Sequence, residues 1–500
     1  MTSKLISTSS DWTFETIEAY DREIGRIARD KFKLDTYPNQ IEMIRSDQMM
    51  DAYASVGMPV FYNHWSYGKH FVSVEQNYSR GRMGLAYEIV INSNPCIAYL
   101  MEENSLTMQA LVIAHACYGH NSFFKGNYLF RSWTDAEAII DYLLFAKNYI
   151  TQCEERHGVQ EVEQLLDSCH ALMNYGVDRY KRPKPISAAE EVLRQQEREV
   201  YIQQHINDLW RTIPSRKQSG QTFKEEIKFP ADPQENILYF MEKNAPMLEN
   251  WQREIIRIVR KIAQYFYPQR QTQVMNEGWA TFWHYTLLNE MYDQGLVSDG
   301  FMMEFLTSHT NVVAQPDFDS RYYSGINPYA LGFAMMKDIR RICENPTAED
   351  KAWFPDIAGS DWIKTLDYVM RNYRDESFIL QFMSPKIMRD FHFFALQDDD
   401  RANAIEVKAI HNDEGYRALR ETLSQQYNLS YREPDIQVES VNLRGDRSLT
   451  LSHYMSERRP LGNDTYELLR HIHHIWGYDV YLNSVEPDGR RARSYRLGAS

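Results

Sequence analysis

Apolar side chains recur at helical spacing along most of the chain. The first such segment, residues 11–35, carries its apolar residues three or four positions apart, at Phe14, Ile17, Tyr20, Ile24 and Ile27. This period places them on one face, so the segment is predicted to form an amphipathic helix. The same pattern predicts further helices over residues 134–153, 159–180, 187–211, 248–266, 274–293, 300–310 and 328–343.

Local signals between these segments predict one more helix and a strand. Ser105 is a favourable N-cap for a helix that runs through Tyr118, and Gly119 is predicted to end it. Residues 85–91 are predicted to form a short strand. The aromatic stretch 57–68 is broken by Gly and Pro, and it is therefore predicted to be an ordered loop.

The end of the chain changes from helical to alternating patterns. Two β-hairpins are predicted because paired segments flank turn sequences, at 435–443 with 448–454 and at 478–485 with 491–497. A helix is predicted between them, with Asp464 as its N-cap and Gly477 at its end. The result is a small ββαββ domain.

These elements predict a mainly α protein. Its large helical core has two lobes, with a zincin-like helix arrangement as one option, and a small C-terminal α+β domain follows. The predicted units are an N-terminal helical lobe, a polar excursion and linker, a second helical lobe and the C-terminal domain, at residues 1–180, 181–235, 236–424 and 425–500.

Composition limits the function classes. The formal net charge of −14 repels phosphate, so nucleic acid is not expected as a partner. The five cysteines are scattered and form no CxxC pair, which predicts neither a disulfide framework nor a cysteine-rich zinc site. No apolar run is long enough to span a bilayer, and no signal peptide is apparent. These features predict a cytoplasmic protein without a membrane span.

The first candidate for chemistry is the pair His115 and His120. Imidazoles bind transition metals, but zincins place their two histidines four positions apart, and these are five apart. On a regular helix they would diverge by about 140°. We therefore expect Gly119 to turn His120 back toward His115. Ala116 stands where a zincin carries its catalytic glutamate, so a base would come from elsewhere, with Glu88 and Glu155 as candidates.

The second candidate is the polar stripe formed by Glu277, Thr281 and His284 on an otherwise apolar helix. A histidine-rich helix end followed later by Asn-Glu-Gly-x-Ala resembles gluzincin metallopeptidases, in which the later glutamate is the third zinc ligand. We predict that a divalent metal such as zinc is bound by His115, His120 and Glu277. The expected second-sphere or pocket residues are His284, Thr281, Glu88 and His64. The alternative is a polar network inside a helix bundle.

Several long, unusual strings resemble the SpoVR (stage V sporulation protein R) family. They lie in the expected order at residues 61–69, 87–95, 114–124, 275–280, 325–332 and 442–449, and the segment near Tyr416 resembles the Gram-negative branch. The resemblance implies a link to spore cortex (peptidoglycan) formation. In bacteria that do not sporulate, it implies a stress or stationary-phase protein whose partners are a PrkA-type serine protein kinase and its small companion protein.

The sequence predicts a regulatory function, with an active metallohydrolase as the alternative. The missing zincin glutamate favours a regulatory protein linked to stress, sporulation and the cell envelope, built on a metal-binding or degenerate hydrolase-like site. The grouping of histidines and glutamate favours an active zincin-like metallohydrolase that acts on a peptide or cell-wall-related substrate.

Overall fold

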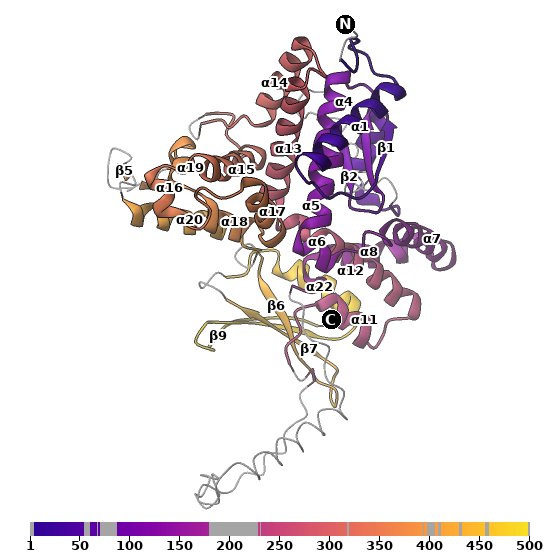
Figure 1. Ribbon diagram of the computed structural model, residues 1–500. Helices are drawn as coiled ribbons and strands as arrows, with labels where there is room; N and C mark the ends of the chain where they lie inside the picture. The colour runs from indigo at the N-terminus through magenta and orange to yellow at the C-terminus, as the bar shows by residue number, and fades with distance from the viewer. Residues whose placement is uncertain are drawn as a thin grey trace, which may run out of the picture.

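The computed structural model describes residues 5–54, 61–67, 69–70, 88–179, 229–230, 232–317, 320–393, 395–397, 406–408, 412–429, 433–455 and 460–498. Within these residues the mainly α architecture is confirmed (Figure 1). The helix predicted at 187–211 and most of the linker at 181–235 lie outside the described residues. None of the described helices is both long and apolar enough to cross a membrane.

Helices form most of the described chain. The first group is α1 (Phe14–Asp30), α2 (Ser46–Ala54), α4 (Leu106–Val112), the π-helix η1 (Ile113–His120), α5 (Asn121–Gly126), α6 (Tyr128–Trp133), α7 (Ile139–His157), α8 (Val159–Ala171) and the 3₁₀ helix η2 (Met173–Tyr175). The second group is α11 (Ile237–Asn244), α12 (Asn250–Arg270), α13 (Gln273–Asp293), α14 (Asp299–Val312), α15 (Pro328–Glu344), α16 (Ala348–Trp353), α17 (Trp362–Asn372), α18 (Asp375–Phe382), α19 (Pro385–Asp390), α20 (Asp413–Gln426) and α22 (Thr465–Trp476). The helices predicted at 248–266, 274–293, 300–310 and 328–343 correspond to α12, α13, α14 and α15.

Helix α13 is the centre of the larger apolar core (Figure 1). It packs against η1 through Ala280 and against α15 through Gly278. A Cβ atom on Gly119 would lie 2.5 Å from the Cα atom of Ala280, and one on Gly278 would lie 2.4 Å from the Cα atom of Gly332. These glycines therefore let three helix backbones approach closely.

The prediction that Gly119 ends its helix was wrong. Ser105 is the N-cap of α4 as predicted, and it accepts a hydrogen bond from the backbone of Met108. The helix then widens into η1 and continues directly into α5. Gly119 is needed for close contact with α13 rather than for a turn, since Ala280 occupies the space that a side chain would fill.

A three-stranded sheet, in the order β1-β3-β2, lies beside these helices. Strand β1 (Asn39–Ile44) runs parallel to β3 (Cys96–Met101), and β2 (Glu88–Ile91) runs antiparallel to β3. Strand β2 confirms the predicted strand over its described residues. Its first residue, Glu88, is thereby held at the sheet margin next to η1.

The C-terminal residues form the predicted ββαββ unit. Its sheet has the order β6-β7-β8-β9, from β6 (Asp435–Val441), β7 (Leu449–Tyr454), β8 (Val480–Val485) and β9 (Arg491–Leu497). Helix α22 crosses between β7 and β8, which are parallel, and ends at Gly477 with a φ of 83°. Asp464 occupies the N-cap position, but its side chain makes no capping hydrogen bond. A two-stranded pair, β4 (Ala395–Gln397) and β5 (Glu406–Lys408), lies earlier in the chain.

The C-terminal sheet shares its apolar core with helices α7, α8, α11 and α12. Trp476 is stacked against Phe240 of α11 at a ring distance of 6.0 Å. The backbone of β6 also hydrogen-bonds to Gln234, which precedes α11 in sequence. The division into four units stays a prediction, and this shared core gives it a specific test.

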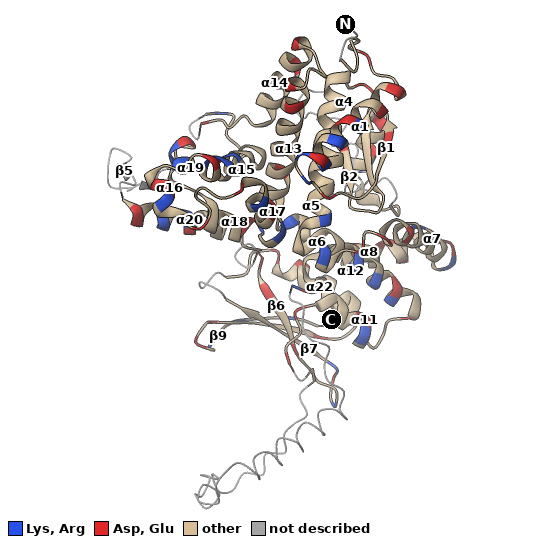
Figure 2. Cartoon of the chain, viewed as in Figure 1, with Lys and Arg blue, Asp and Glu red and all other residues tan. Residues whose placement is uncertain are grey.

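Figure 2 shows acidic and basic residues interspersed over the described outer helices, not gathered into one band. The central helix α13 is different, since most of its residues are apolar and buried. A carboxylate such as that of Glu277 is costly there unless a cation or a donor compensates it. A metal-binding or catalytic site is therefore expected around α13.

Candidate metal centre

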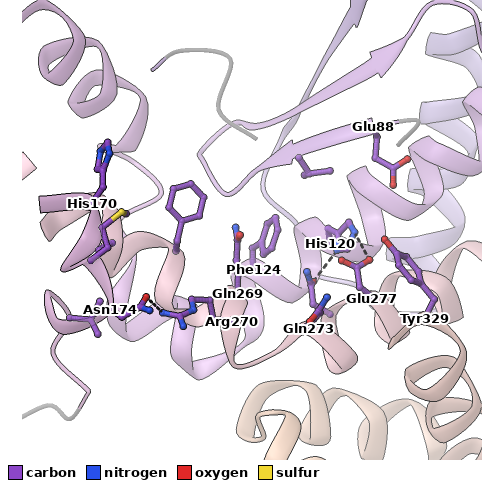
Figure 3. Close-up of a pocket in the computed structure, with 16 residues that line it drawn as sticks. Glu88, His120, Phe124, His170, Asn174, Gln269, Arg270, Gln273, Glu277 and Tyr329 are labelled. Carbon is purple, nitrogen blue, oxygen red and sulfur yellow. Dashed lines mark hydrogen bonds and ion pairs between the residues drawn. The ribbon is translucent and has the colours of Figure 1, made fainter. Parts of the chain in front are cut away.

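Side chains from η1, α13 and β2 converge at one place: His115, His120, Glu277 and Glu88. Figure 3 shows the last three of them. The Nε2 atoms of His115 and His120 lie 3.7 Å and 3.5 Å from Oε2 of Glu277. Oε1 of Glu88, from β2, lies 3.5 Å from Nε2 of His115. Possible ligand atoms of Glu88, His115 and His120 all lie within 4.8 Å of one another. The sequence-predicted trio is thus brought together, and Glu88 joins it.

The π-helix explains how histidines five positions apart meet. Because a π-helix closes hydrogen bonds between residues five apart, His115 and His120 lie about one turn apart on the same face. Their ring centroids are 4.6 Å apart with planes at 90°. On a regular helix, a spacing of five positions would point the two histidines apart. On this π-helix the same spacing allows both histidines to bind one metal ion.

In each of the two histidines, the Nδ1 atom has a hydrogen-bond partner on the side away from the centre. Nδ1 of His120 lies 2.9 Å from Oδ1 of Asn276, so it donates to that oxygen and leaves Nε2 free for the centre. Nδ1 of His115 lies 3.0 Å from Nδ1 of His284, and Nε2 of His284 lies 2.8 Å from Nδ1 of His309. Metal-binding histidines characteristically carry such partners, which fix the ring and its tautomer.

The spacing of the donor atoms fits one small ion. Tetrahedral coordination at about 2.0–2.1 Å requires neighbouring donor atoms about 3.3–3.5 Å apart. The observed separations of 3.7 Å and 3.5 Å between Oε2 of Glu277 and the Nε2 atoms of His115 and His120 need only a small contraction. Two imidazoles with carboxylates are also the donor set of many zinc sites.

The protein compensates the two carboxylates of the centre unequally. Burial, together with the charge of Glu277, raises the pKa of Glu88 to about 8. Burial also lowers the pKa of His115 to about 4, so its ring is neutral at neutral pH. Burial acts to raise the pKa of Glu277, but His120, His115 and Tyr329 outweigh it and bring that pKa below its usual value. A divalent cation would stabilise both carboxylates.

Glu277 provides a further sign of a missing partner. Its Oε2 atom is buried and has no hydrogen-bond partner among the described residues. That same oxygen is the atom nearest to both histidines. Buried polar atoms are nearly always satisfied, and a cation between these groups would satisfy this one.

The remaining sequence-predicted residues lie in different places. His284 lies behind His115, as expected of a second-sphere group. Thr281 is buried on α13, and its hydroxyl has no hydrogen-bond partner among the described residues. His64 is outside the cluster, because its imidazole lies 3.2 Å from Asp167 and 2.6 Å from Ser66. Glu155 is exposed on α7, so Glu88 is the nearby carboxylate of the two proposed bases.

Sequence reasoning missed three residues of the site. Asn276 and Tyr329 lie inside family-like strings, so those strings could have indicated them. Tyr329 helps to lower the pKa of Glu277, and its ring stacks on that of His115 at 6.2 Å. His309 had no local signal, since only the fold brings α14 against His284.

The centre opens on a pocket of about 720 Å³. Glu88, His120, Glu277 and Tyr329 line one part of it, while His170, Asn174 and Arg270 line another (Figure 3). The volume is typical of a site for a small molecule or a short peptide. His120 and Glu277 are therefore accessible to a substrate.

Comparisons with known proteins cover nearly the whole chain. The family model for SpoVR like protein matches residues 11–432, and the model for SpoVR-like C-terminal domain matches residues 434–487. A relative from Escherichia coli (strain K12), described as uncharacterized protein YcgB, is 66% identical over 484 residues. That alignment covers 97% of this chain and 94% of the relative. No solved structure matches the chain.

Proposed function

The chain belongs to the SpoVR family, and we propose that it is a metal-dependent hydrolase whose centre binds a divalent metal such as zinc. The observation that supports this most is the convergence of His115, His120 and Glu277 at ligand spacing, with His120 and Glu277 on the wall of an accessible pocket. These three side chains would hold the ion. A bound divalent ion would supply Lewis-acid chemistry, by activating water and polarising a carbonyl group.

Glu88 has the position required of the missing base. Its carboxylate comes from a separate strand, lies 3.5 Å from His115 and lines the pocket. It would accept a proton from the attacking water and return it to the leaving group. Glu88 would thus take the role of the catalytic glutamate of zincins, whose position in this chain is occupied by Ala116. This favours an active hydrolase over a degenerate, inactive site.

Metal analysis tests the proposal directly. Purified protein loaded with zinc and then desalted is expected to keep one ion per chain, measured by mass spectrometry. The double variant His115→Ala, His120→Ala is expected to lose it. His157→Ala is the control, because His157 is an exposed histidine distant in sequence from the cluster. Retention of the ion in the double variant would show that the cluster is a polar network.

The family resemblance supports a second proposal, a cytoplasmic regulatory role. In it the protein acts in stress, stationary-phase or sporulation processes of the cell envelope, with a PrkA-type kinase and its companion protein. The same centre would then contribute only to the stability of the fold. A deletion strain separates the proposals: Glu277→Gln is expected to fail to restore the phenotype if the centre does chemistry. Full restoration by a folded, abundant Glu277→Gln protein would favour the regulatory role.

A further inference from the structure

We propose that the substrate is a short peptide-like molecule whose carboxylate binds at Arg270, with its amide groups lying along the pocket toward Glu277. This inference rests on the proposed hydrolase function and names the substrate class of the same site. It follows from the distribution of charge and of amide side chains on the pocket wall.

The two parts of the pocket differ in charge. Its carboxylates, Glu88 and Glu277, are both at the candidate metal centre. Arg270 is the single lysine or arginine among the lining residues, and Figure 3 shows it away from that centre, beside Asn174. A bound divalent ion would balance the two carboxylates. Arg270 would then be the remaining charge of the pocket wall.

Arg270 shares its ion-pair partner with a second arginine. Glu433 bonds Arg270 through one carboxylate oxygen and lies 3.4 Å from Arg179 through the other. One carboxylate thus serves two guanidinium groups. Arg270 also donates to Oδ1 of Asn174 at 2.7 Å. These contacts fix the orientation of the guanidinium group of Arg270. Because a guanidinium has five N–H donors, some of them remain available to a ligand carboxylate.

Amide side chains line the path between the two parts. Gln269 and Gln273 face the pocket, and among the described residues neither side chain is hydrogen-bonded to another protein group. A carboxamide can donate and accept, so it matches the peptide group of a ligand. Phe124 and Phe266 add apolar wall for a side chain. The pocket volume of about 720 Å³ suits a ligand of only a few residues.

Paired peptide hydroxamates test the inference with a defined probe. Each carries a hydroxamate that chelates a protein-bound divalent ion, then two or three residues, and it ends in either a free carboxylate or a carboxamide. Calorimetry with the zinc-loaded full chain is expected to show about tenfold tighter binding of the carboxylate form. Arg270→Gln is expected to remove this preference, and Arg270→Lys to keep part of it.

Arg179→Gln is the matched control, because Arg179 contacts the same Glu433 but does not line the pocket. It is expected to keep the preference. Equal binding of both probes by the wild type, or a preference that survives in Arg270→Gln, would overturn the inference and leave the metal centre intact. Failure of both hydroxamates to bind zinc-loaded protein would instead contradict the hydrolase proposal. If Arg270→Gln does not fold, Arg270→Lys tests the same contact, because it is expected to keep only part of the preference for the carboxylate probe.

Discussion

The Nδ1 atom of His115 lies 3.0 Å from the Nδ1 atom of His284, and both rings are buried. One hydrogen must lie between these nitrogens, so one ring donates and the other accepts. If Nε2 of His115 binds an ion, its Nδ1 carries the hydrogen and His284 accepts it. Nε2 of His284 then donates to Nδ1 of His309. Metal binding thus fixes the direction of a three-histidine chain.

This chain predicts that His309 supports metal binding from a distance. His309→Leu removes the acceptor for His284, and we expect zinc affinity to fall by about tenfold, the lower end of second-sphere effects. His309→Asn keeps an acceptor oxygen near the position of Nδ1, so we expect affinity close to wild type. Competition with a chelating dye measures both. Equal affinities of the two variants would show that His309 only fills space.

The ends of helices were predictable from the sequence where a few neighbouring residues determine them. Ser105 begins α4 and Gly477 ends α22 because capping depends on neighbouring residues alone. The strongly periodic helices and both C-terminal hairpins were predicted for the same reason. The π-helix was not predictable in this way, and it lies where Gly119 packs closely against the backbone of α13.

The candidate site was predictable only in part. Glu277 was marked as a ligand because a carboxylate on an apolar helix requires a partner. Its distances to His115 and His120 depend on η1 packing against α13, which no local pattern specifies. The strand holding Glu88 is brought to the same place by the sheet, so its position relative to the histidines could not be derived from spacing.

The shared core predicts that Trp476 stabilises more than the C-terminal unit. Trp476 is 2% exposed and stacks on Phe240 of α11. We expect Trp476→Ala to lower the free energy of unfolding by about 3–5 kcal/mol, and to do so in one transition. Tyr466→Ala on the same helix is the control, since Tyr466 is 49% exposed. Differential scanning calorimetry that resolves a separate C-terminal transition would support an independent domain.

A buried ion pair predicts the acid sensitivity of the fold. Arg341 donates two hydrogen bonds to Asp350, at 2.6 Å and 2.7 Å, and holds the pKa of that carboxyl well below its usual range. A carboxyl whose pKa is lower in the folded state stabilises the protein above its unfolded pKa of about 4 and loses that contribution as pH falls further. We therefore expect the free energy of unfolding to decrease below about pH 4.

Asp350→Asn tests this contribution. We expect it to lower stability at pH 7 by about 2–3 kcal/mol, because a charge-assisted hydrogen-bond pair is lost, and to flatten the acid dependence. Asp367→Asn removes a comparable contact to Arg371, but the side chain of Asp367 is 47% exposed, so we expect a change below about 1 kcal/mol. Urea titrations from pH 3 to 7 measure both; an unchanged acid slope in Asp350→Asn would contradict the assignment.

The role of Glu88 separates catalysis from metal binding. The three ligand candidates are on η1 and α13, whereas Glu88 is on β2 and lies 3.5 Å from His115. Glu88→Gln keeps the shape but cannot accept a proton from water. We expect this variant to retain its zinc and to hydrolyse a fluorogenic peptide library about 10²–10⁴-fold more slowly, the usual contribution of a general base.

Glu155→Gln is the control, because that carboxylate is exposed on α7. Loss of zinc in Glu88→Gln would make Glu88 a fourth ligand, and unchanged turnover with zinc retained would exclude it as the base.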